Sequence, residues 1–328
     1  RHMFSHHILK PERQPLEANI WGTPKSSGAF STLFRSRLLK ALAYRDAPFE
    51  VEINRIGDRK KVGKRYDCNM PIPKDLYHAK SGGDIRPRSV YLTCGNSAST
   101  DLADGSVDLI VTDPPFFDNV HYSELADFFH VWQAQLLGKK PIEGITTRNE
   151  GEVQDQDARE FTEKLAAVFT ECHRVLKDGG ILAFTYHHSR EEGWSSVIQA
   201  LTLARFRPVS AQPVKAEMAI AIPKHQARDP ITLDMILVCR KQQDDHRACL
   251  NAKDAYAAAI RLAQDRALSL CKAGHALSRN DCRIIVLSQV LVALSAGRNG
   301  PELLSLFEDY LCEMQQESSQ IHSMISRR

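Results

Sequence analysis

Zinc-like spacing is absent from the cysteines of this sequence. Eight cysteines are scattered over 328 residues, and no two of them form a C-x-x-C pair. The histidines add no cluster with the spacing of a zinc site. The pattern excludes a sequence-coded zinc module, so we expect no metal. It favours reduced, mostly buried thiols in a cytoplasmic protein.

Long hydrophobic runs are also scarce, although 43% of the residues are hydrophobic and 25% are charged. The longest run, residues 284–296, is interrupted by Ser288 and Gln289. It is shorter than the roughly 20 residues of a membrane helix. No signal-peptide pattern opens the chain. Since the first residue is Arg1 rather than Met, we expect a fragment or a trimmed chain.

The sequence also lacks a glycine-rich nucleotide-binding loop. Nucleotide-binding α/β sheets usually carry a G-x-G loop after the first strand and an acidic residue at the end of the second. No G-x-G occurs here, and residues 1–84 offer one good strand, at residues 49–56. We therefore expect an α/β sheet that is incomplete within this chain.

Positive charge is uneven along the sequence. The formal net charge is only +3, yet residues 1–88 contain 18 lysines and arginines against 9 acidic residues. Five of the seven residues from Arg59 to Arg65 are basic. Such a run is either a solvated loop or a phosphate-binding segment, and the composition alone favours neither.

Three regions follow from the order of the predicted elements. Residues 1–84 form a basic, partly irregular segment, residues 85–241 alternate strands with helices, and residues 242–328 are helical. Alternation at this spacing predicts a doubly wound α/β sheet. The predicted strands are residues 49–56, 89–93, 107–112, 181–186, 205–214 and 231–240. The predicted helices are residues 32–44, 123–137, 161–176 (ended by Gly179 and Gly180), 194–204, 250–273, 279–296 and 301–316, with a linker at 67–87.

A nearly continuous apolar strand leads into the motif Asp113-Pro114-Pro115-Phe116. Residues 107–112 predict a strand buried on both faces, and ligands bind beyond the carboxyl ends of such strands. The two prolines stiffen the turn and remove two backbone donors. The turn therefore presents two acceptors, the Asp113 carboxylate and the Pro114 carbonyl, beside the aromatic face of Phe116.

This arrangement suits methyl transfer to the exocyclic amine of adenine or cytosine. That nitrogen is a poor nucleophile because its lone pair is delocalised into the ring. Two acceptors on its N–H groups offset the positive charge that develops during attack on a sulfonium methyl group. A base that leaves the duplex also needs a stacking partner, which Phe116 can provide. Whether Asp113 takes the proton stays open, and the alternative is a strand-exit turn without chemistry.

The motif at residues 113–116 resembles the (D/N/S)PP(Y/F) motif of amino-directed, S-adenosylmethionine-dependent DNA methyltransferases. The longer stretch 112–132, TDPPFFDNVHYSELADFFHVW, resembles a subfamily of long adenine-specific DNA methylases of bacteria and archaea that contains a domain of unknown function. Residues 20–30, IWGTPKSSGAF, are similar to that subfamily as well. The resemblance covers residues 1–240 and is most specific over residues 107–132.

The resemblance implies a Rossmann-like methyltransferase sheet, S-adenosylmethionine as the cofactor and adenine in DNA as the target. It places Gly95 and Asn96 near the adenine of the cofactor, although a plain turn explains these two residues equally well. Phe116 in place of the frequent tyrosine keeps stacking and loses a hydroxyl. In the longer relatives the glycine loop lies upstream of the position that corresponds to Arg1. An upstream domain or a second subunit is therefore expected to complete the cofactor site.

Further candidates lie close to the motif. His121 and Tyr122 follow it and are expected at the wall of the substrate pocket, with a surface position as the alternative for His121. Of His187 and His188, which follow a strand, at most one can face the site because adjacent strand residues point in opposite directions. The long polar loop 138–158 is a candidate for target contacts.

Basic candidates lie in the first region. Lys25 belongs to a Gly/Ser-rich loop, which either binds a cofactor carboxylate or a DNA phosphate or is an ordinary surface loop. Arg59, Lys60 and Lys61 are the candidate phosphate contacts of the basic run.

Three functions remain in competition. The first is a DNA adenine amino-methyltransferase, and the second is an RNA or other amino-methyltransferase that uses the same turn. The third is a non-catalytic DNA-binding or partner subunit with an incomplete cofactor site. Methyl transfer to DNA compared with RNA distinguishes them.

Overall fold

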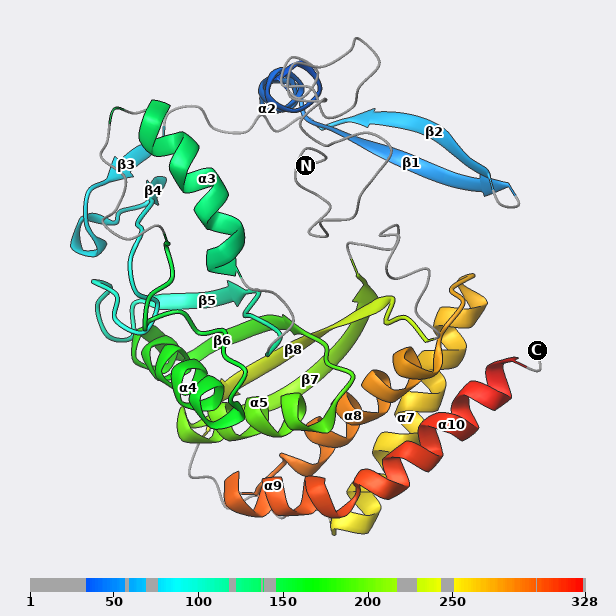
Figure 1. Ribbon diagram of the computed structural model, residues 1–328. Helices are drawn as coiled ribbons and strands as arrows, with labels where there is room; N and C mark the ends of the chain where they lie inside the picture. Colours follow the sequence, from blue (N-terminus) through cyan, green and yellow to red (C-terminus); the bar gives the residue numbers. More distant parts are fainter. Residues whose placement is uncertain are drawn as a thin grey trace. The chain divides into compact units, whose positions relative to one another are not determined.

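The computed structural model describes residues 34–56, 59–68, 76–117, 122–136, 138, 146–216, 229–242, 251–298 and 300–326. Side chains within residues 53–62, and at several positions of the helix that starts at Tyr122, lie outside this description. The chain divides into two compact units. The N-terminal unit comprises residues 1–80 and 85–92, and the C-terminal unit comprises residues 81–84 and 93–328. Figure 1 labels their elements.

The N-terminal unit contains more regular structure than the sequence predicted. A π-helix, η2 (Phe34–Leu39), continues as α2 (Lys40–Asp46), in agreement with a predicted helix there. Strand β1 (Phe49–Ile56) was also predicted, and it pairs antiparallel with β2 (Arg59–Asp67). The basic run therefore lies on a strand rather than in a loop. The predicted linker likewise contains a strand, β3 (Tyr77–Ala79), which pairs parallel with β4 (Ser89–Tyr91).

A mixed four-stranded sheet organises the C-terminal unit. Its strands are β5 (Val107–Thr112), β6 (Leu176–Tyr186), β8 (Leu233–Lys241) and β7 (Phe206–Lys215), in the spatial order β5-β6-β8-β7. β5 and β6 run parallel, whereas β8 is antiparallel to both of its neighbours. The α/β class is confirmed. The described sheet is mixed and short, so the expected Rossmann-like sheet, incomplete within this chain, stays a prediction.

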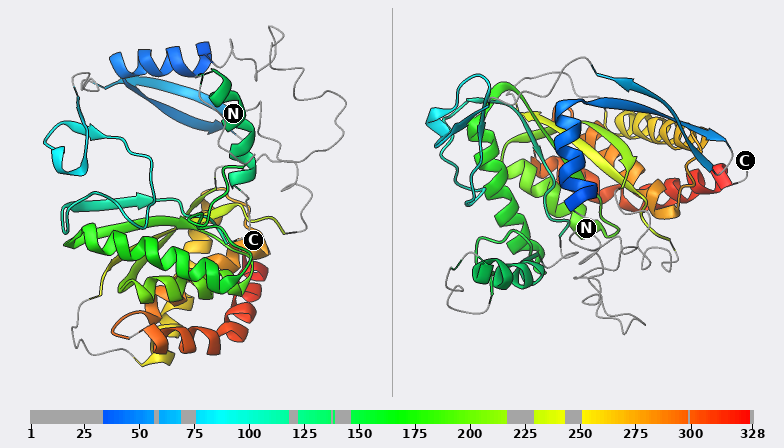
Figure 2. Two further views of the ribbon diagram at one scale, coloured as in Figure 1. Left: turned by 60° about the vertical axis from the view of Figure 1, so that its left-hand side comes forward. Right: turned by 90° about the horizontal axis from the view of Figure 1, so that it is seen from above.

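Two helices cover one face of this sheet (Figures 1 and 2). α4 (Ala158–Val175) begins after Asp157, whose side chain accepts hydrogen bonds from two backbone N–H groups of the first turn. α5 is Glu191–Leu203. Apolar side chains of both helices interlock with alternate residues of β6 in one core, among them Phe161, Leu165, Phe169, Leu182, Phe184 and Trp194. Burial of this kind contributes about 1.5–3 kcal/mol for each large side chain. The predicted helix end at Gly179 was wrong, because both glycines lie inside β6.

The opposite face of the sheet is much less buried in the described residues. Side chains alternate along a strand, and the set that does not face α4 and α5 is half-buried or exposed in β6 and β8. On β5 the effect is strongest, since Leu109 is 56% exposed and Val111 is 73% exposed. The prediction of a strand buried on both faces was therefore wrong. Among the described residues β5 pairs with β6 alone.

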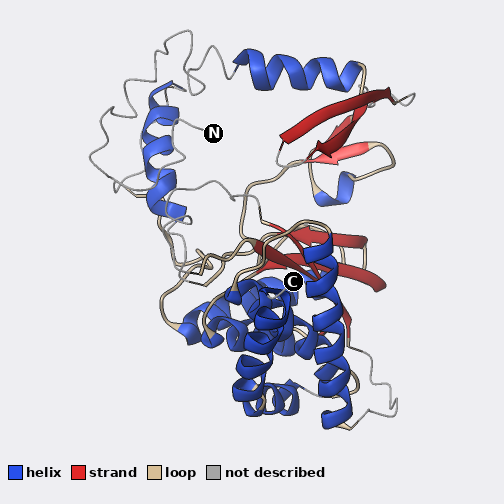
Figure 3. Ribbon diagram, turned by 90° about the vertical axis from the view of Figure 1, so that its right-hand side faces the viewer, coloured by secondary structure: helices blue, strands red, loops and turns tan. Residues whose placement is uncertain are grey.

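The remaining helices begin with α3 (Tyr122–Leu136), which follows the motif, and end with four C-terminal helices. These are α7 (Ala252–Lys272), α8 (Arg279–Leu294), α9 (Gly300–Asp309) and α10 (Leu311–Ser326). In Figure 3 the helices of this unit other than α3 gather on one side of the sheet. α8 is joined to β7 by two side-chain bonds, Gln289 to the Ala211 carbonyl at 3.0 Å and Ser295 to the Pro208 carbonyl at 2.7 Å.

One helix had been predicted over residues 301–316. The described chain forms two there, with Tyr310 between them. None of the described helices combines the length and the apolar character that a membrane crossing requires.

A buried carboxylate fastens the start of β8 to α8. Asp281 is fully buried and accepts hydrogen bonds from the backbone N–H and hydroxyl of Thr232 and from the Leu233 N–H. The Asp281 carboxylate also accepts from the Ser278 N–H, while the Ser278 hydroxyl accepts from the Asp281 N–H. This pair of reciprocal bonds is a capping box at the start of α8. The bonds fix the end of β8 that lies beside the carboxyl end of β6.

We expect Asp281→Ala to destabilise the protein by roughly 3 kcal/mol or more, because several buried donors would lose their acceptor at about 1–3 kcal/mol each. The matched control is Asp254→Ala in the first turn of α7, where the side chain is exposed. It should change stability by less than about 0.5 kcal/mol. Urea unfolding measures both, and similar small effects would contradict the anchoring role of Asp281.

Candidate active site at the ends of β5 and β6

The motif occupies the carboxyl end of β5, next to the carboxyl end of β6. Parallel pairing sets Thr112 opposite Phe184, so the residue after each strand lies at the same edge of the sheet. There the Thr185 hydroxyl donates a hydrogen bond to Asp113 Oδ1. Pro114 is buried, whereas Asp113 is exposed. The carboxylate is thus held from one side by a neighbouring strand and remains open to solvent.

Two aromatic side chains of the β6 end surround Phe116. Its ring centroid lies 5.6 Å from that of Tyr186, with the planes at 85°. The centroid of the His187 ring is 4.6 Å away, and the planes are tilted by 59°. His187 Nδ1 is hydrogen-bonded to Asp234 Oδ1 on β8. Phe116 is half-buried, so these contacts orient its ring without enclosing it.

Phe117 reverses the backbone directly after the motif. Its φ is 57°, a left-handed conformation that is uncommon for bulky residues. Its ring is only 3% exposed and makes edge contacts with Phe161 and His188. His188 is buried, while His187 lies on the other face of the chain beside Phe116. Strand alternation predicted this division between the two histidines. Burial of Phe117 offsets the cost of the turn, which is of order 1–3 kcal/mol.

Tyr122, at the start of α3, lies within electrostatic reach of the motif carboxylate. Partial burial, and secondly the negative charge of Asp113, raise the pKa of Tyr122 above its ordinary value. The phenol therefore keeps its proton at neutral pH. Its side chain is 50% exposed, which leaves the hydroxyl available as a hydrogen-bond donor near Asp113.

The described end of the long polar loop, residues 146–157, is tied to the first turns of α3. The Thr147 hydroxyl donates to the Ser123 carbonyl at 3.1 Å, and the Ser123 N–H donates to Glu152 Oε1 at 3.0 Å. Asp127 accepts from the Thr147 backbone N–H, a hydrogen bond that lowers the pKa of Asp127. The loop thereby fixes the helix start that carries Tyr122.

The same loop approaches Asn96. A Cβ on Gly151 would lie 4.0 Å from Asn96 Nδ2. Asn96 Oδ1 accepts from the Ala98 N–H at 2.9 Å, which forms a tight turn. At Gly95, an added Cβ would meet no atom of the described chain within 4 Å. The space beside Gly95 is therefore free of described atoms.

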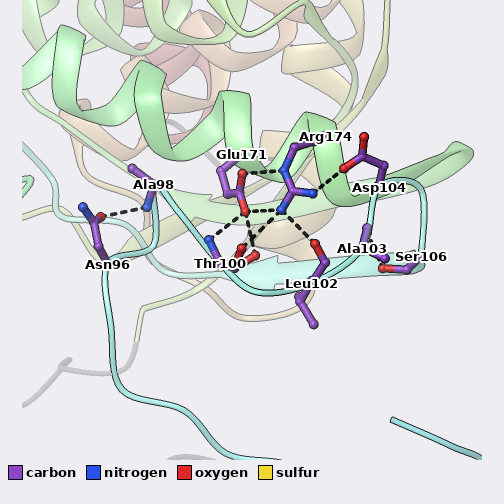
Figure 4. A network of polar contacts seen from close by, with 9 residues as sticks. All are labelled: Asn96, Ala98, Thr100, Leu102, Ala103, Asp104, Ser106, Glu171 and Arg174. Atoms are coloured by element: carbon purple, nitrogen blue, oxygen red, sulfur yellow. Dashed lines mark hydrogen bonds and ion pairs between the residues drawn. The ribbon is translucent and has the colours of Figure 1, made fainter. Parts of the chain in front are cut away.

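An ion-pair network on α4 holds the segment between Asn96 and β5 (Figure 4). Glu171 accepts from the Thr100 N–H at 2.8 Å and from Arg174 Nε at 2.8 Å. Arg174 donates to the Leu102 carbonyl at 2.8 Å and pairs with Asp104. Chiefly through Arg174, the pKa of Glu171 is lowered to about 2. The network links the Asn96 turn to the strand that ends in Asp113.

Several sequence candidates lie outside this description. Lys25 and His121 are not among the described residues. Arg59, Lys60 and Lys61 lie on β2 in the N-terminal unit, but their side chains are not described. The structure therefore brings together the motif and Tyr122, and it places Asn96 beside the loop that fixes α3. In the described part of the chain no cluster of His, Cys, Asp and Glu could hold a metal ion.

Comparison with known proteins adds little to this geometry. No model of a protein family matches the sequence, and no curated protein matches it significantly. Among solved structures, a proposed DNA modification methylase from Thermus thermophilus is similar at 15% identity with a TM-score of 0.25. The match covers 55% of this chain and 59% of that one. So low a TM-score carries no argument about fold or function.

Sequence reasoning missed two residues that contact the motif region, Thr185 and Asp234. Thr185 could have been found from the strand it ends, because a parallel neighbour of β5 must finish at the same edge. Asp234 stands near the start of β8, and only antiparallel pairing with β6 brings that start to the site. The sequence contains no signal for that pairing.

We expect Glu171→Gln to destabilise the protein by about 1–3 kcal/mol at pH 7, because the charged hydrogen bonds of a nearly buried carboxylate are lost. Its folded pKa lies below the ordinary value of 4.5, so its contribution is complete above about pH 4.5 and disappears as the pH falls toward 2. The control, Glu163→Gln, removes an exposed pair on the same helix, with a loss of at most about 1 kcal/mol. If the difference in unfolding free energy between the wild type and Glu171→Gln did not change with pH, the result would contradict the role of Glu171 in the network.

Proposed function

We propose that this protein is an amino-directed methyltransferase that methylates the exocyclic amine of adenine in DNA. The observation that carries the proposal is the Asp113 carboxylate, held by the Thr185 hydroxyl at the end of β5 and open to solvent, with the Phe116 ring beside it. A hydrogen-bond acceptor next to an aromatic face is what an aminopurine needs for orientation and stacking.

In the proposed reaction the residues of the motif orient the base and stabilise charge, and they form no covalent bond with the substrate. The amino nitrogen attacks a methyl carbon, so an N–C bond forms, the S–C bond breaks and its electron pair stays on sulfur. The nitrogen then loses one proton, either to the Asp113 carboxylate or to solvent water. Asp113 accepts a hydrogen bond from the amine and offsets the positive charge on nitrogen in the transition state. Two prolines keep backbone donors away from the amine, and Phe116 stacks on the base.

Part of the site fits S-adenosylmethionine, which would supply the methyl group. The open backbone at Gly95 and the Asn96 amide suit the adenine edge of that cofactor. The described residues include no glycine-rich loop and no acidic residue placed for a ribose. The fit is therefore restricted to one edge of the cofactor, and the proposal assigns further binding groups to sequence outside the described residues.

The exposed face and edge of β5 support this assignment. Leu109 and Val111 are largely exposed on a strand whose second edge has no partner in the described chain. Open apolar edges of this kind are normally covered in native proteins. We propose that an upstream domain or a second subunit pairs with β5 and brings the missing cofactor groups to Asp113.

DNA as the substrate is supported by the β1–β2 ribbon of the N-terminal unit. A two-stranded ribbon fits the major groove of DNA, and β2 carries the basic run from Arg59 to Arg65. Arg65 lies 4.0 Å over the Phe49 ring, and Lys64 lies over the exposed Tyr66. Cations beside exposed aromatic rings are common on surfaces that bind nucleic acid. RNA is the alternative substrate.

Asp113→Ala should reduce methyl transfer by the complete enzyme at least 100-fold, since it removes a transition-state acceptor worth about 3–4 kcal/mol. The fold should be unchanged, because the side chain is exposed at a strand end. Asp108→Ala, an exposed carboxylate at the other end of β5, is the matched control and should keep full activity. A folded Asp113→Ala protein with most of its activity would refute the assignment.

Neutralising Arg59, Lys60, Lys61, Lys64 and Arg65 should make DNA binding less sensitive to salt. Each lost phosphate contact lowers the slope of log K against log salt by about 0.9, or roughly 4.5 for all five. Neutralising Lys253, Arg261 and Lys272 on α7 removes three positive charges elsewhere, and this control should leave the slope nearly unchanged. Titrations at several salt concentrations measure the slopes. Equal slopes in the wild type and the quintuple variant would show that the ribbon does not bind phosphates.

The chain alone should bind S-adenosylmethionine weakly or not at all. Each unpaired polar group of the cofactor costs roughly 1–3 kcal/mol, and two or three of them remove most of a micromolar affinity of about 8 kcal/mol. Isothermal titration with and without an added upstream fragment measures this. Micromolar binding by the chain alone would place a complete cofactor site within it.

A further inference from the structure

We infer that His187 and Asp234 form a positioning pair that sets the orientation of the Phe116 ring. This inference rests on the proposed function, since it assigns to the pair the alignment of the base that stacks on Phe116. His187 would be a positioning residue, acting through Phe116 rather than through the reacting nitrogen.

The first support is the position of the pair in the sheet. Thr185 and His187 are two residues apart, so their side chains emerge on the same face of the chain. Thr185 contacts Asp113, the first residue of the motif, and His187 contacts Phe116, the last. The end of β6 thus touches both ends of the motif. The Thr185 hydroxyl orients the Asp113 carboxylate, and the His187 imidazole contacts the Phe116 ring.

The second support is the way in which His187 is fixed. Its Nδ1 is bonded to Asp234 Oδ1, and the two side chains are only 15% and 16% exposed. A carboxylate can only accept, so Nδ1 carries a hydrogen and the ring has one preferred orientation. Asp234 is fixed in turn, because the residues just before it, Thr232 and Leu233, are bonded to the buried Asp281.

The third support is the incomplete enclosure of Phe116. Tyr186 meets its ring only edge-on, and the Tyr186 hydroxyl is already bonded to the Gly193 carbonyl at 2.8 Å. Tyr186 therefore limits one side of the ring and leaves the side toward His187 to the imidazole. The closer contact, at 4.6 Å, is with His187. The fixed imidazole therefore restricts the Phe116 ring by direct contact, at an interplanar angle of 59°.

A structural readout tests the pair without reference to methylation. The full-length protein is labelled with fluorinated phenylalanine, and the Phe116 resonance is assigned by its loss in Phe116→Leu. It should shift or broaden in His187→Ala and in Asp234→Ala. Asp234→Asn keeps an acceptor for Nδ1 and should leave it as in the wild type. The resonance of Phe169, buried under α4, is the internal control. An unchanged Phe116 resonance in both alanine variants would overturn the inference.

A binding cycle tests the consequence for the base. The probe is the deoxynucleotide of 2-aminopurine, whose fluorescence is quenched when it stacks. His187→Ala should weaken its binding about tenfold, the upper end of what one aromatic contact contributes. In the Phe116→Ala background the same change should have less than a twofold effect. Equal weakening in both backgrounds would show that His187 acts on the fold or on the base directly, and would overturn the inference.

The two experiments separate the inference from the function on which it rests. Absence of probe binding by the wild-type protein, together with a perturbed Phe116 resonance in the alanine variants, would refute base capture and retain the positioning pair. Probe binding by the wild type, together with an unchanged Phe116 resonance in the alanine variants, would support base capture and refute the positioning pair.

Discussion

The parallel pairing of β5 with β6 is the constraint on which the candidate site depends. Two prolines make the motif rigid and remove two of its four backbone donors, so its side chains depend on a neighbouring element for their orientation. The register that sets Thr112 opposite Phe184 brings Thr185 to Asp113 and His187 to Phe116. A shift of one residue would turn both side chains of β6 to the core face and leave the motif without either contact.

The register is maintained from both sides of β6. On one side, Glu171 and Arg174 of α4 hold the segment that leads into β5. On the other, antiparallel β8 supplies Asp234, and the buried Asp281 fixes the start of that strand. Each of these contacts joins segments that are distant in the chain. The site is therefore a product of the whole C-terminal unit, although its chemistry is concentrated in four consecutive residues.

Much of this unit could be predicted from its sequence, because the signals are local. The apolar run 107–112 and the helix expected over residues 161–176 lie close to the observed bounds of β5 and α4. The position of Asp113 at a strand end followed from the same run.

Pairing between strands could not be predicted, because it depends on contacts distant in sequence. For that reason Asp234 was missed. β5 was expected to be buried because its residues are apolar, yet Leu109 and Val111 are largely exposed in the described structure. In the same way Gly179 and Gly180 looked like a helix end, whereas pairing of the residues on either side of them with β5 makes them part of a strand.

The central claim is that the Asp113 turn serves transfer of a methyl group to an amine of DNA. The most direct measurement is transfer of a labelled methyl group from S-adenosylmethionine by the longest natural form of the protein. Matched DNA and RNA of the same sequences are offered, and the modified nucleoside is identified by mass. The account predicts N6-methyladenine in DNA and little label in RNA. Label confined to RNA, or a folded protein that labels neither, would contradict it.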